Sequence, residues 1–257
     1  MDPWSNYEQV HNRDRRTVRL DREKHLLKTK MQNSLSYHTA VIDGVDRNVA
    51  ITNTDNLDTK HIFSVPGEDL PHGGYVEWMG NHWLITERDA NSEIYTKCVM
   101  LQCNYLLKWV DEDDVIHEQW CIVEDGTKYL TGEYEDRNFV VTRGDSRIAV
   151  TIARNEYTSK LGRVYRFLID DPNSTQRLAY SLTKPLKLYN VFNGNGVFKF
   201  VLQEVNSTDD DNFELGIADY YKHFPRDGQS SSDEPSDGQQ SGTEQPADDN
   251  PGRRVWL

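Results

Sequence analysis

The chain has 257 residues, which is enough for one large domain or two small ones that each bury a core. Apolar residues make up 36% and the formal net charge is −13, so broad electrostatic binding to nucleic acid is disfavoured because an acidic surface repels phosphate. The sequence has no apolar run of about 18 residues and no basic-then-apolar N-terminus, which argues against a membrane span and a secretory signal. We therefore expect a soluble protein, cytosolic or part of a particle, with no membrane partner.

Residues 1–36 predict a basic, helical N-terminal arm. No Gly or Pro lies between His11 and Met31, and the apolar stripe is thin. Residues 1–30 hold eight Lys and Arg against five Asp and Glu. The arm is either a solvated helix or a docking element that gains its packing from a partner. In the second interpretation, the interface residues are five arginines: Arg13, Arg15, Arg16, Arg19 and Arg22.

Residues 37–136 predict a small β-barrel or sandwich. Short apolar runs alternate with turn signals such as Gly80-Asn81, and an acidic hairpin tip, solvated in this interpretation, spans 111–114. This spacing favours an all-β domain over alternating α/β units. The predicted strands are Asn48–Thr52, His61–Val65, Tyr75–Met79, His82–Glu87, Ile94–Gln102, Tyr105–Val110 and Val115–Val123.

Residues 137–224 predict a second, sandwich-like β unit. Asn195-Gly196 is expected to form one of its turns, and Phe213–Phe224 a short terminal helix. The remaining 225–257 predict a disordered acidic tail, since 23 of the 26 residues in 227–252 are Ser, Gln, Gly, Pro, Asp or Glu. The expected strands are Arg147–Ile152, Val164–Ile169, Leu178–Leu182, Leu186–Val191 and Val197–Gln203.

The residue types that carry chemistry do not assemble into a motif. The three cysteines, Cys98, Cys103 and Cys121, lack the spacing of a zinc site and are expected to be buried, inert thiols. His72 and His82 are expected on the surface. No nucleophile elbow, phosphate loop or metal-binding spacing occurs in the sequence. We therefore predict no catalytic, cofactor-binding or metal-binding residue, and a protein that is not an enzyme.

The tryptophans are expected to pack inside the protein. Trp78, Trp83, Trp109 and Trp120 lie in predicted strands, where aromatic side chains are favoured as core and cross-strand partners. Stacking on bases would call for a basic groove, and this stretch is acidic instead. The predicted structural core includes Trp78, Trp83, Trp109 and Cys103.

One stretch resembles a known family. It runs from Gly73-Gly74-Tyr75-Val76-Glu77-Trp78 through Trp83-Leu84-Ile85 and Cys98 to Cys103-Asn104-Tyr105-Leu106-Leu107-Lys108-Trp109. A Gly-led strand, a short turn, a Trp-Leu-Ile strand and a Cys-Asn pair before a strand ending in Trp are similar to the head-closure and head–tail connector proteins of tailed phages and prophages of Gram-positive bacteria. The resemblance is best over about 40–125, while the length, the second β unit and the acidic tail depart from it.

The resemblance implies a structural virion protein built on a small β-barrel. Such a subunit would self-associate, in twelve or six copies, as a ring below the portal that retains the packaged DNA and joins head to tail. Its partners would be the portal or adaptor ring and tail proteins, with DNA only passing through the lumen, and the protein would be assembled into virions in the host cytoplasm. The basic arm is expected to dock on the portal.

Two other functions stay open. A distal-tail or baseplate component with a partner- or carbohydrate-binding β domain would share the β content and the aromatic residues. A hydrolase on a β scaffold would need carboxylates brought together from distant positions, which one sequence cannot reveal.

Overall fold

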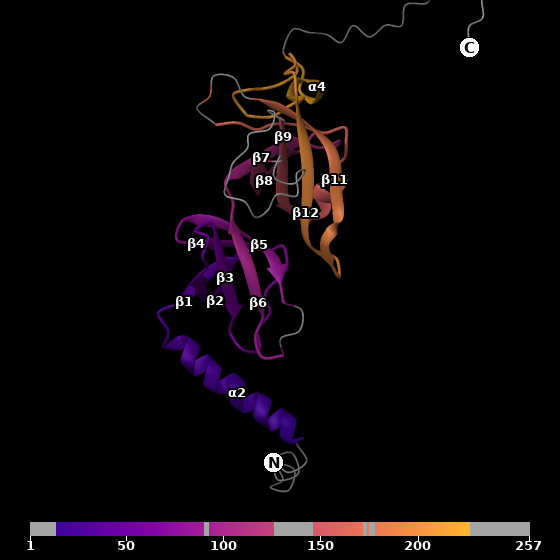
Figure 1. Cartoon of the computed structure of the whole chain (residues 1–257). Helices are drawn as coiled ribbons and strands as arrows, with labels where there is room; N and C mark the ends of the chain where they lie inside the picture. Colours follow the sequence, from indigo (N-terminus) through magenta and orange to yellow (C-terminus); the bar gives the residue numbers. More distant parts are fainter. Residues whose placement is uncertain (1–13, 90–92, 126–145, 172–173, 175–177, 227–257) are drawn as a thin grey trace, which may run out of the picture. The chain divides into compact units, whose positions relative to one another are not determined.

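The computed structural model describes residues 14–89, 93–125, 146–171, 174 and 178–226 (Figure 1). Arg13 and the acidic tail from residue 227 onward therefore lie outside the described residues. The protein is mainly β, as predicted, with an N-terminal helix and two β-sheets that both curl. Both sheets belong to one compact unit that ends at Phe224, and a second unit begins at Pro225.

The N-terminal arm contains one long helix, α2 (Arg15–Gln32). Its sequence is rich in Arg, Lys and Leu, which have good helix propensity, and it contains no Gly or Pro. Met31, in the last turn, is the one buried residue of the helix. The helix therefore forms where the sequence predicts it, but it buries little of its own surface.

Six strands after the helix close into a barrel, in the order β1-β2-β3-β6-β5-β4. The barrel closes because β4 pairs antiparallel with β1, which places Val41 opposite Glu77 and Ile42 opposite Val76. Apolar side chains from all six strands alternate inward, as the two-residue period of a strand requires. The strands are β1 (Tyr37–Ile42), β2 (Val45–Asn53), β3 (Thr59–Ser64), β4 (Tyr75–Trp78), β5 (Asn81–Arg88) and β6 (Lys97–Gln102).

The second sheet has six antiparallel strands in the order β10-β11-β12-β9-β8-β7. Its two edge strands approach each other, since the Tyr105 hydroxyl of β7 donates to the Leu168 carbonyl of β10 at 2.9 Å. The curl encloses an apolar core built around Phe167, Phe198 and Phe200. The strands are β7 (Tyr105–Val110), β8 (Ile116–Asp125), β9 (Arg147–Ala153), β10 (Arg166–Leu168), β11 (Ala179–Phe192) and β12 (Asn195–Val205), with short helices α3 (Glu156–Lys160) and α4 (Tyr220–His223).

The division between the two β units differs from the predicted one. The sequence placed 105–123 in the first domain, which was expected to end at 136, but β7 and β8 belong to the second sheet. The barrel is complete at Gln102, where β6 ends. A strand pattern reveals which face is apolar but not which sheet the strand joins, so the extra hairpin could not be assigned from the sequence.

Several local predictions also need correction. The β4–β5 turn is Met79-Gly80 and the β11–β12 turn is Asn193-Gly194, each one or two residues before the predicted pair. Both residues of each turn have positive φ, as tight hairpins that follow the strand twist require. The expected helix over Phe213–Phe224 is reduced to α4, because Gly216 and Asp219 also adopt positive φ.

Strand β11 continues through Pro185 with a register shift on each side of it, where the sequence predicted two separate strands. Strand β10 pairs only with Ala179–Ser181, so Pro185 lies where β11 is an edge and needs no N–H on its outer side. The sequence prediction also missed β1, which begins after the short turn that follows α2.

Candidate functional site

The three cysteines are buried, as predicted. Burial raises the pKa of the Cys98 and Cys103 thiols to about 12. Burial also raises the pKa of Cys121, which is fully buried. A thiol with so high a pKa is protonated near neutral pH, and the thiol form is a poor nucleophile.

The acidic hairpin between β7 and β8 is organised by a buried carboxylate. Asp111 accepts hydrogen bonds from the backbone N–H groups of Asp113 and Val115, both at 2.9 Å, and pairs with His117 Nε2 at 2.6 Å. These hydrogen bonds, that of His117 above all, lower the pKa of the Asp111 carboxyl. The sequence predicted a fully solvated tip. Instead Asp111 is buried and fixes the loop, while its neighbours Glu112 and Asp113 are exposed.

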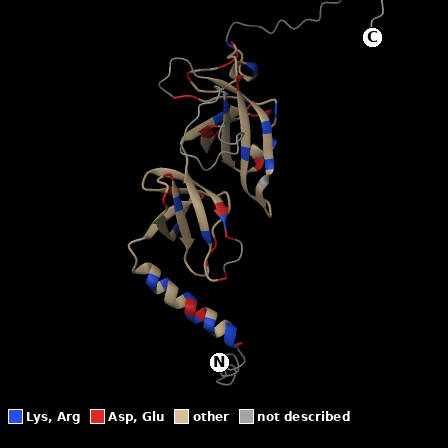
Figure 2. Ribbon diagram, in the orientation of Figure 1, with Lys and Arg blue, Asp and Glu red and all other residues tan. Residues whose placement is uncertain are grey.

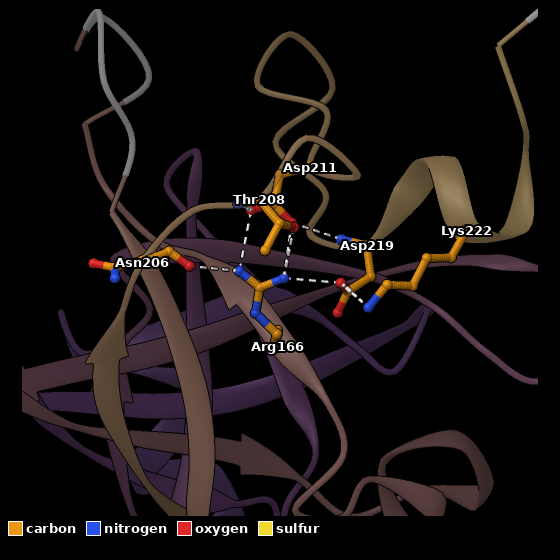
Figure 3. Close-up of polar contacts among 6 residues, drawn as sticks. All are labelled: Arg166, Asn206, Thr208, Asp211, Asp219 and Lys222. Atoms are coloured by element: carbon orange, nitrogen blue, oxygen red, sulfur yellow. Dashed lines mark hydrogen bonds and ion pairs between the residues drawn. The ribbon is translucent and has the colours of Figure 1, made fainter. Parts of the chain in front are cut away.

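A second polar cluster joins β10 to the segment that follows β12 (Figure 3). The Arg166 guanidinium donates to both carboxylate oxygens of Asp211, at 3.1 and 3.2 Å, and to Asp219 at 2.8 Å. It also donates to the Asn206 carbonyl and the Thr208 hydroxyl. The five hydrogen bonds of the guanidinium all go to groups of the same chain, so this cluster is an internal clamp.

Within the described part of the chain, no three His, Cys, Asp or Glu side chains come together as a metal site. The helices described there are also too short or too polar to cross a bilayer. The arm helix α2 is the first surface to consider as a candidate functional site.

Helix α2 carries seven Lys and Arg against two Asp and Glu (Figure 2). Its half-buried and buried positions, Leu20, Lys24, Leu27 and Met31, recur at intervals of four and three residues and so form one stripe. Two residues along a helix correspond to a rotation of about 200°, so the residue two positions after a member of this stripe lies on the opposite side of the helix. Arg22 and Leu26 are such residues, and Leu26 is 43% exposed.

The predicted interface arginines separate into two groups on this helix. Arg16 lies near the buried stripe and forms an ion pair with Glu93 at 2.6 Å. Arg15, Arg19 and Arg22 are exposed and recur at the four- and three-residue spacing of a single face. We call Arg15, Val18, Arg19, Arg22 and Leu26 the outward face of α2. Arg13 lies outside the described residues.

The predicted core residues all belong to or pack against apolar clusters, but they are buried to different degrees. Trp83 is 3% exposed in the barrel core, and Trp109 is 2% exposed in the core of the second sheet. Trp78 is half-buried and packs against Trp83 with ring centroids 6.2 Å apart. Cys103 is 7% exposed and belongs to a separate cluster that contains residues of both sheets.

That cluster marks a junction that sequence reasoning missed. Leu84 of β5 and Cys103 pack with Ile122, Ala153 and Val197 of the second sheet. Beside them the Tyr75 hydroxyl donates to the Trp120 carbonyl and accepts from Gln119 Nε2 at 2.9 Å. Burial raises the pKa of Tyr75 well above its usual range. Tyrosine and glutamine in strands give no sequence signal of such a contact.

His72 and His82 do not behave as the free surface histidines that the sequence suggested. His72 is 7% exposed, its Nε2 is 2.9 Å from the Thr86 carbonyl, and its ring stacks on Phe192. His82 stacks on Trp120 with ring centroids 4.4 Å apart. Both therefore join a barrel element to a residue of the second sheet.

Comparison with known proteins gives a match to a family model. Residues 7–102 match the family model of the YomX N-terminal domain, a phage-derived family of the Bacillus prophage type. The matched range ends at the last residue of β6, so it covers α2 and the whole closed barrel. No curated protein and no solved structure matches the chain. The match indicates a phage protein and does not extend to the second sheet.

Proposed function

We propose that this chain is a structural virion protein of a tailed phage that forms part of the head–tail connector. In this proposal it is a head-closure subunit, arranged in a ring below the portal, that retains the packaged DNA and joins head to tail. The observation that carries the proposal is the match of residues 7–102 to a phage-derived family, over a range that coincides with a helix and one closed barrel.

The charge distribution supports this role. The chain has a net charge of −13, and its helix α2 is strongly basic. A ring whose inner wall is acidic repels DNA phosphates and so lets DNA pass without gripping it. A basic helix with an exposed face offers a point of attachment to an acidic neighbour within the connector. Under this proposal the protein performs no catalysis and needs no cofactor.

A second candidate is a distal-tail or baseplate component. It is favoured by the second sheet, which lies outside the matched range and presents Leu188 at 88% exposure on the long strand β11. A second sheet outside the matched barrel suits a binding module for another virion protein or a carbohydrate.

The two candidates differ in whether the protein binds a portal ring. Purified portal rings of the same phage are mixed with the full chain and weighed by mass photometry. The connector proposal expects the ring mass to rise by a fixed number of subunits, and the tail-component candidate expects no change. Negative-stain images of the heavier species then check that the added density forms a ring on one end of the portal.

A further inference from the structure

The outward face of α2 has the chemistry of a docking surface. Arg15, Arg19 and Arg22 present three guanidinium groups in a row, and Val18 and Leu26 add apolar surface at 48% and 43% exposure. Each of these two apolar residues is four positions from Arg22, so they flank it on the same side of the helix. Exposed apolar side chains among arginines are typical of the central part of protein interfaces.

A surface of matching chemistry lies on the second sheet of the same chain. The tip of the β7–β8 hairpin exposes Glu112 and Asp113, followed by Val115 at 48% and Ile116 at 42% exposure. It combines acidic and apolar side chains within five residues, as the outward face of α2 combines basic and apolar ones. We call residues 112–116 the acidic tip.

The acidic tip is held in one conformation before any partner binds. Asp111 fixes the backbone of the loop through the N–H groups of Asp113 and Val115. Asp114, in the left-handed region at φ 59°, is anchored by His223 Nδ1 at 2.7 Å. A loop that is already ordered loses little conformational entropy on binding, so its charges can contribute to affinity.

We propose that the outward face of α2 docks on the acidic tip of a second copy of this chain. The inference rests on the proposed function, because it assigns a contact between neighbouring subunits of the ring. One surface is a helix face and the other is a hairpin tip of the second sheet, so the two copies present different surfaces to each other. The contact is therefore head-to-tail. Repetition of a head-to-tail contact closes into a ring when the rotation fits and otherwise grows a filament.

The interface is expected to be small for a single pair of copies. The outward face runs from Arg15 to Leu26, about 17 Å along the helix, and together with one hairpin tip it covers less surface than a standard stable interface. Association should therefore need micromolar protein and weaken as salt screens the charges. Within a ring each copy is held on both sides, which increases the effective strength of the contact.

The test is the oligomeric state of the full chain by sedimentation velocity at low and high salt. The double variant Arg19→Glu/Arg22→Glu and the double variant Glu112→Arg/Asp113→Arg should each associate at least about tenfold more weakly than the unchanged chain, because like charges then face each other. An equimolar mixture of the two variants should associate again, since the introduced glutamates of one meet the introduced arginines of the other.

The control variant is Lys28→Glu/Lys97→Glu, which changes exposed residues outside both surfaces and lowers the net charge by as much as Arg19→Glu/Arg22→Glu does. It should associate like the unchanged chain. If the unchanged chain stays monomeric at every concentration, or if the mixture fails to recover association, the inference is wrong. Mass photometry of the same samples with portal rings separates this failure from that of the proposed function, since portal binding by a monomeric chain would leave the connector proposal intact.

Discussion

Replacement of Arg166 by methionine should release the segment that follows β12 from the second sheet. Methionine keeps most of the aliphatic length of arginine but removes all five guanidinium hydrogen bonds that hold Asn206, Thr208, Asp211 and Asp219. The side chain of Asp211 is completely buried, so its carboxylate would lose its counter-charge in a site with no access to water.

The magnitude follows from what remains around that carboxylate. Breaking a buried ion pair by removing one partner costs about 3–5 kcal/mol. Asp211 keeps hydrogen bonds from the Thr208 and Asp219 backbone N–H groups, at 2.8 and 2.9 Å, and Asp219 keeps Lys222 at 2.7 Å. We therefore expect the lower end of that range, about 3 kcal/mol.

Hydrogen exchange and urea unfolding measure the effect. Amides of 206–224 should lose protection while those of the barrel strands stay protected, because the clamp joins elements of the second sheet only. The matched control is Arg163→Met, at an exposed arginine three residues earlier. Adding Asp211→Asn to Arg166→Met should recover part of the stability by removing the unpaired charge. If Arg166→Met is as stable as the unchanged chain, with 206–224 equally protected, the clamp is not a stabilising element.

Three further predictions concern the core, the acidic tip and the tail. Trp83→Ala should cost about 3–5 kcal/mol, whereas Trp83→Phe should cost much less, because the buried indole N–H has no acceptor among the described residues; equal losses in urea unfolding would contradict this. The lowered pKa of Asp111 adds stability above the unfolded pKa of about 3.9 that is lost as the pH falls toward the folded value. The stability advantage over Asp111→Asn should therefore be full near neutral pH and shrink below about pH 4, and a constant difference across that range would refute the assignment. Deleting 227–257 should leave the melting temperature nearly unchanged, given its polar composition; a fall of many degrees in calorimetry would show that the tail contributes to the fold.

The sequence predicts the strands well because their alternation reflects a buried face. Trp83 and Trp109 could be assigned to cores for the same reason, and both are almost fully buried. Which sheet a strand joins cannot be predicted in the same way. It depends on pairings such as Val41 with Glu77, which close the barrel without β7 and β8. Such pairings between distant residues leave no local signal, so the predicted boundary at 136 was wrong.

The candidate interface was predictable only in part. The four- and three-residue spacing of Arg15, Arg19 and Arg22 can be read directly from the sequence and places them on one helix face. The partner of Arg16 cannot be predicted from the sequence, because Glu93 lies 77 residues further along the chain. The buried state of His72 likewise depends on Thr86 and Phe192, which a lone histidine in a loop does not reveal.

Cryo-electron microscopy of the neck of intact phage particles shows whether the protein is part of the connector. We expect a ring of density directly below the portal, into whose repeating unit the closed barrel of β1–β6 fits, with α2 of each copy in contact with a neighbouring subunit. Density for the same barrel in the distal tail or baseplate, or absence of the protein from purified particles, would contradict it.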